Sequence, residues 1–142
     1  MSEQSVTRKA IAWGPVVLWA LALFLLSEPW FALPGFQRLL DESTYYSDKL
    51  GHFVLYLALG GLLARGRWAS GIEVRHTVLL AVGWAYGALD EWHQSFVPGR
   101  TPDIADWLAD VAGVAVGYTI ITLARASGCS RKNSLIRSSA KP

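Results

Sequence analysis

Residues 90–110, DEWHQSFVPGRTPDIADWLAD, place seven ionisable side chains between two strongly apolar segments. The preceding segment, residues 77–89, holds no charge, and the following one, residues 104–124, is charged only at Asp106 and Asp110. An ionisable group at membrane depth costs about 2.5 kcal/mol or more, so such groups face the interior of a bundle or water. The quoted stretch therefore predicts a connection between two packed membrane helices.

The composition favours a membrane protein. The chain has 142 residues, of which 52% are hydrophobic, 17% are charged and seven are Trp, unlike an ordinary soluble domain. Its net charge of +2, from basic residues dispersed along the chain, excludes a nucleic-acid-binding surface. The lone Cys129 cannot form an intramolecular disulfide.

Four apolar segments predict an all-α, four-helix transmembrane bundle over residues 11–124, between a cytoplasmic arm (1–10) and a basic, disordered cytoplasmic tail (125–142). Residues 11–27 are uncharged, and no small-x-small cleavage pattern follows them, which favours a retained helix over a signal peptide. The uncharged cores of the second and third segments fall short of the roughly 20 residues that a span needs. Both reach full length only if the second helix begins near Asp48 and the third continues to about Gln94.

The distribution of basic residues predicts the orientation. With four spans, ten of the 13 Lys and Arg residues lie on the side of both termini. The positive-inside rule then places the termini in the cytoplasm and the quoted stretch on the outer side. The first loop, residues 28–49, mixes aromatic and acidic residues and predicts either an interfacial segment that caps the bundle or an ordinary surface loop.

Polar and small residues share one face on each of three predicted helices, because residues three or four apart are neighbours on a helix. We expect glycines to allow close helix approach in the inner half and the polar residues to line a pocket in the outer half. The stripes are Asp48, His52 and Tyr56 on the second helix, Gly83, Gly87, Glu91 and Gln94 on the third, and Asp103, Asp106, Asp110, Gly113 and Gly117 on the fourth.

The predicted pocket is acidic, with Lys49 and Arg100 offsetting part of its charge. A divalent cation or a cationic ligand could balance the remainder, although no specific motif indicates a metal and none is assigned. Some members also have a purely structural interpretation. Thr101-Pro102-Asp103 has the pattern of an N-cap followed by Pro and an acid in the first turn, and Trp92 and His93 fit an interfacial position.

Two separated motifs resemble the VanZ-like family of membrane proteins, which is named for a protein associated with resistance to the glycopeptide teicoplanin. They are SDKLGH (47–52), with Tyr56 following, and DEWHQSFVPGR (90–100), with Asp103, Asp106 and Gly113 following. The resemblance covers residues 47–117 and implies a bacterial cytoplasmic membrane protein whose reaction, if any, it does not specify. Where the family usually has Asn in the fourth helix, this chain has Asp110. The polar positions that the resemblance carries over are Asp48, Lys49, His52, Tyr56, Glu91, Gln94, Arg100, Asp103 and Asp106.

Three functional hypotheses follow. The first is an envelope protein whose outer pocket binds a lipid headgroup or a lipid-linked cell-wall intermediate and so influences glycopeptide susceptibility. The second is a membrane-embedded enzyme, with His52 or Glu91 as general base and a metal held by Asp48, Asp106 or Asp110. The third is a non-catalytic structural partner of another envelope protein, whose charges lock the helices in register. No HExxH or GxSxG motif supports the enzyme, so catalysis stays open.

Overall fold

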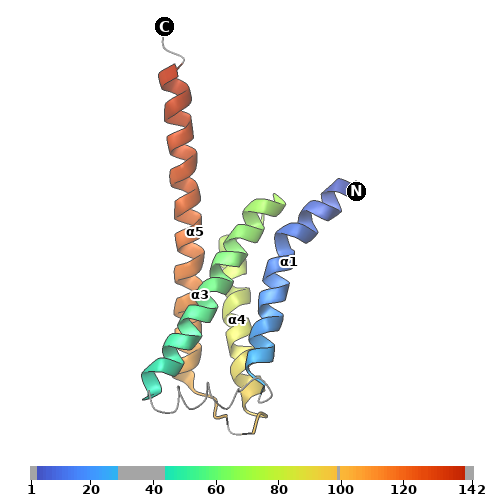
Figure 1. Cartoon of the computed structure of the whole chain (residues 1–142), viewed down its shortest axis with the longest axis vertical. Helices are drawn as coiled ribbons and strands as arrows, with labels where there is room; N and C mark the ends of the chain where they lie inside the picture. Colours follow the sequence, from blue (N-terminus) through green and yellow to red (C-terminus); the bar gives the residue numbers. More distant parts are fainter. Residues whose placement is uncertain (1–2, 29–43, 99, 140–142) are drawn as a thin grey trace.

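The computed structural model describes residues 3–28, 44–98 and 100–139, and within these ranges the chain is all-helical (Figure 1). The helices are α1 (Glu3–Leu26), α3 (Thr44–Ser70), α4 (His76–Gln94) and α5 (Ile104–Ser139). The predicted all-α class is confirmed. Most of the first loop, with its aromatic residues and its predicted interfacial or surface role, lies outside the described residues.

Helix bounds agree with the sequence patterns at the polar connection and differ from them at the termini. The end of α4 at Gln94 and the start of α5 at Ile104 are the predicted positions. By contrast, α1 begins at Glu3, within the predicted arm, and α5 continues to Ser139, through most of the segment that we expected to be disordered. No proline occurs between residues 103 and 141, so no proline interrupts α5 once it has begun.

The central pair of the bundle is α3 and α5, with α1 and α4 packed against it. Figure 1 shows α1 and α5 on opposite sides of α3, with both termini at the same end of the molecule. Glycines bring α3 and α5 into backbone contact, since a Cβ atom on Gly117 or Gly60 would collide with the carbonyl oxygen of Leu57 or Val114. The predicted role of small residues in close helix approach is therefore confirmed.

The outer surface of the bundle is apolar. Large apolar side chains are exposed on every described helix, for example Leu18 on α1, Val54 on α3, Leu89 on α4 and Ile120 on α5. Two helices, α1 over its whole length and α5 over Ile104–Cys129, are long and apolar enough to cross a membrane. An apolar exterior around buried charges is the reverse of a soluble domain.

Candidate functional site

The polar side chains gather at one end of the bundle, where α3 begins, α4 ends and α5 begins (lower part of Figure 1). We call this region the polar end. Tyr56, Asp90, Glu91, Asp106 and Asp110 are all buried there. The polar end is therefore a charged core between helices.

Lys49 joins the start of α3 to the start of α5. Its ammonium donates to Asp103 Oδ2 at 2.8 Å and to Asp106 Oδ1 at 2.5 Å. The hydrogen bond from Lys49, together with one from the backbone N–H of Ala105, lowers the pKa of Asp103 below its usual 3.8. Lys49 thus offsets two of the carboxylates, as predicted.

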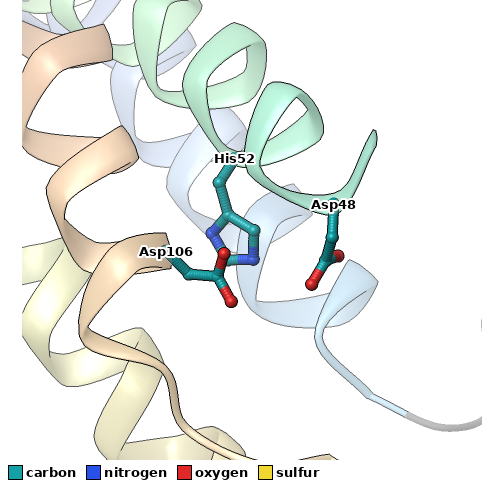
Figure 2. A group of neighbouring side chains, drawn as sticks. All are labelled: Asp48, His52 and Asp106. Carbon is teal, nitrogen blue, oxygen red and sulfur yellow. The ribbon is translucent and has the colours of Figure 1, made fainter. Parts of the chain in front are cut away.

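His52 lies between the acidic residues of α3 and α5. Figure 2 shows its ring directed from α3 toward Asp106 on α5, with Asp48 one turn earlier on α3. Its Nδ1 atom is 3.0 Å from Asp110 Oδ1, and its side chain is 11% exposed. Asp110 is thus in direct contact with His52, at a position where the family that this chain resembles usually has Asn.

Glu91 connects α4 to the N-terminus of α5. Its Oε2 atom accepts a 2.8 Å hydrogen bond from the backbone N–H of Asp103. Asp103 in turn accepts the N–H of Ala105 through Oδ1 at 2.9 Å, which is the geometry of an N-cap residue. The structure therefore corrects the predicted cap from Thr101 to Asp103, because α5 starts at Ile104 and Thr101 precedes it by three residues.

Asp90 is a residue of the polar end that was not among the predicted pocket residues. Its Oδ1 atom accepts a 2.7 Å hydrogen bond from the Ser27 hydroxyl, and its Oδ2 atom accepts bonds from Tyr56 at 3.3 Å and Gln94 at 3.5 Å. Ser27 follows α1, so the polar end includes this helix as well as the three expected ones. The position of Asp90 next to Glu91 in the sequence could have indicated that Asp90 belongs to the site. Nothing in the sequence around Ser27 indicated that its hydroxyl bonds to Asp90.

Arg100 is peripheral to this arrangement. Its side chain is 40% exposed, and its nearest described carboxylate is that of Asp48, at 3.9 Å and 51% exposed. We expected Arg100 to offset several carboxylates, whereas among the described residues it forms one loose, exposed pair. His93, interpreted from sequence as interfacial, lies 3.0 Å from Glu28 through Nε2.

Two sets of side chains at the polar end have the arrangement of metal ligands. They are Asp48 with His52 and Asp106, and His52 with Glu91 and Asp110. In each set, one potential ligand atom per residue lies within 4.8 Å of the others. The polar end can therefore hold a cation or orient hydroxyl and amine groups of a ligand.

All ten predicted pocket residues lie at the polar end, including Tyr56 and Gln94 through their bonds to Asp90. An open depression lies elsewhere, at the opposite end of the bundle between α1 and α3, and Arg8 and Arg65 are among its lining residues. At the polar end, the predicted site residues make many of their contacts with one another.

Comparison with known proteins identifies one family. A family model described as VanZ/LLP1 matches residues 4–125, which include every residue of the polar end discussed above. Neither a curated protein nor a solved structure matches the chain.

Proposed function

This chain belongs to the VanZ/LLP1 family, and from that premise we propose that it spans the bacterial cytoplasmic membrane four times, with both termini in the cytoplasm. The polar end then opens to the outer leaflet, where it binds the headgroup of a lipid or of a lipid-linked cell-wall intermediate. Occupancy of this site alters how much of that intermediate a teicoplanin-type glycopeptide can reach.

The exterior of the helices supports the membrane part of the proposal. Leu50, Val54 and Leu89 are exposed on the two shorter apolar segments, so α3 and α4 offer apolar surface to lipid despite their buried charges. The opposite end of the bundle, where α1 and α4 start and α3 ends, carries several arginines, among them Arg8, Arg67 and Arg75. Arginines on that side match a cytoplasmic face.

The observation that carries the binding proposal is the convergence of charged side chains from three helices at one end of an apolar bundle. Lys49 is already bonded to Asp103 and Asp106, which leaves Arg100 as the more exposed cation of the region. A planar guanidinium suits phosphate or carboxylate. The excess of acids suits ammonium and hydroxyl groups, so a headgroup that carries both phosphate and amine is the best chemical match.

The topology can be tested with the native cysteine. Cys129 is exposed on the far part of α5, and we expect a membrane-impermeant maleimide to label it only after intact cells are permeabilised. In a Cys129→Ser background, Ser95→Cys at the end of α4 should be labelled from outside without permeabilisation. The reverse pattern would place the polar end in the cytoplasm and refute an outer-leaflet site.

The functional part is tested by teicoplanin susceptibility in cells that lack the endogenous protein. We expect wild type to protect, and Glu91→Gln and Arg100→Lys to lose protection at equal membrane abundance. Glu73→Gln, a matched change at an exposed acid outside the polar end, should protect like wild type. Loss of abundance in parallel with loss of protection would favour the structural-partner hypothesis, and full protection by all variants would rule out a role for the polar end.

A further inference from the structure

One partly buried histidine and two buried carboxylates, from three different helices, meet at the polar end. His52 comes from α3, Glu91 from α4 and Asp110 from α5, and one potential ligand atom of each lies within 4.8 Å of the others. The exposed fraction is 11% for the His52 side chain, 7% for Glu91 and 0% for Asp110. A nitrogen and two carboxylates brought together across three helices are the donor set of a metal centre.

The hydrogen bonds at this position are incomplete. Among the described residues, Glu91 Oε1 and Asp110 Oδ2 are buried side-chain oxygens without a hydrogen-bond partner. Leaving a buried acceptor unpaired costs about 1–3 kcal/mol, and more when it is charged. Both of these oxygens belong to the same three-residue group, so a single cation between them would satisfy both.

The charge balance points the same way. Even with a protonated imidazole, His52 supplies one positive charge to the two carboxylates of Glu91 and Asp110. Lys49 is bonded to the other acids of α5, Asp103 and Asp106. Glu91 and Asp110 are therefore two buried acids that share the single positive charge of His52.

The second acid and histidine group is a weaker candidate for the same reason. Asp106 accepts a hydrogen bond from the Lys49 ammonium, and Asp48 is half exposed beside Arg100. Both carboxylates already have a cationic neighbour. This difference selects Glu91 and Asp110, rather than Asp48 and Asp106, as the partners of His52.

We propose that His52, Glu91 and Asp110 form a binding site for a divalent transition-metal ion, with Zn²⁺ and Mn²⁺ as the ions of best fit. Imidazole favours transition metals over Mg²⁺ and Ca²⁺, while the two carboxylates suit Zn²⁺ and Mn²⁺. Ligand atoms about 2.1 Å from one ion are separated by at most about 4.2 Å, so small side-chain rotations bring the three into range. Three protein ligands leave a coordination position for water or for a ligand oxygen.

Neighbouring groups hold two of the three ligands in position. The N–H of Asp103 binds Glu91 Oε2 and leaves Oε1 for the ion. Gly87, one turn before Glu91 on α4, makes room for Asp110, because a Cβ atom there would lie 3.0 Å from Asp110 Oδ2. Such supporting contacts orient the residues that bind the metal directly. Removing one typically lowers the metal affinity by about 10–100-fold.

The direct test is metal analysis of the full chain, purified in detergent through a tag that contains no histidine. We expect wild type to retain roughly one Zn²⁺ or Mn²⁺ per chain, and to rebind the ion in calorimetry after chelation. Glu91→Gln and Asp110→Asn should weaken binding by about tenfold or more. Asp48→Asn, which removes a nearby half-exposed carboxylate outside the group, should bind like wild type.

Helix content and elution on gel filtration, recorded for each variant, separate lost binding from lost folding. If Asp110→Asn fails to fold, Glu91→Gln and the wild-type measurement still decide the matter. A wild-type chain that binds neither ion, or binding that depends on Asp48 and Asp106 but not on Glu91, would overturn the proposal. No lipid or antibiotic enters this experiment, so its result is independent of the proposed headgroup binding.

Discussion

The contact between α3 and α5 differs at its two ends: one is packed through glycines and the other through charged side chains. In the glycine-lined part, Gly60, Gly113 and Gly117 let the two backbones touch. At the polar end, the same two helices hold Lys49, His52 and the α5 aspartates between them. The difference shows that one pair of helices can combine close backbone packing with a charged interior.

The largest loss of folding free energy should come from removing the buried ion pairs of the polar end. Lys49→Met keeps the length of the side chain but leaves buried Asp106 without its ammonium, and losing one partner of a buried pair costs about 3–5 kcal/mol. Arg100→Met removes an exposed pair at 3.9 Å, which is worth about 1 kcal/mol or less. The free energies of unfolding, measured by SDS titration, should differ accordingly, and equal losses would contradict the burial argument.

The glycine side is tested by Gly117→Ala. The added Cβ would meet the Leu57 carbonyl oxygen, part of a backbone that cannot rotate away, so we expect a loss of about 1–3 kcal/mol. Gly51→Ala is the control, because a Cβ there has no neighbour within 4 Å and alanine favours helix. A stable Gly117→Ala protein would mean that α3 and α5 do not approach through this glycine in the membrane.

An effect of similar size to that of Gly117→Ala is expected where α1 joins the polar end. Ser27→Ala removes the 2.7 Å hydrogen bond to Asp90, and a bond to a charged group is worth about 1.5–3 kcal/mol. Ser95→Ala is the matched control, since that exposed hydroxyl donates to the carbonyl oxygen of Trp92 within its own turn. Equal stability of the two variants in the same titration would show that α1 is not coupled to the cluster through Ser27.

The smallest effect should be a pH dependence at Asp103. Its pKa is lower in the folded chain than its usual 3.8, so its charge stabilises the fold above that value and the contribution is lost as the pH falls through the folded pKa. Asp103→Asn keeps the cap to Ala105 but not the charge. The difference in melting temperature between wild type and this variant should therefore shrink below pH 3.8, and a constant difference would exclude the carboxylate charge as its cause.

Several features of the polar end could be predicted from the sequence because helical periodicity is a local property. Spacings of three and four placed Asp106 and Asp110 on one face with Gly113 and Gly117, and the structure buries that face against α3. The apolar lengths of the third and fourth segments predicted where α4 ends and α5 begins. The extension of α5 to Ser139 was not predicted, because basic and polar composition says little about whether an existing helix continues.

The sequence by itself determined the helices, their polar and glycine-lined faces, and the family to which the chain belongs, since all of these depend on residue types at short spacings. Only the tertiary structure decided which charges meet. It paired Lys49 with Asp103 and Asp106, left Arg100 at the periphery, and brought Ser27 to Asp90 across 63 positions. Such contacts depend on the relative rotation and depth of whole helices, which are set by the close glycine packing of α3 on α5 and by no spacing within a single helix.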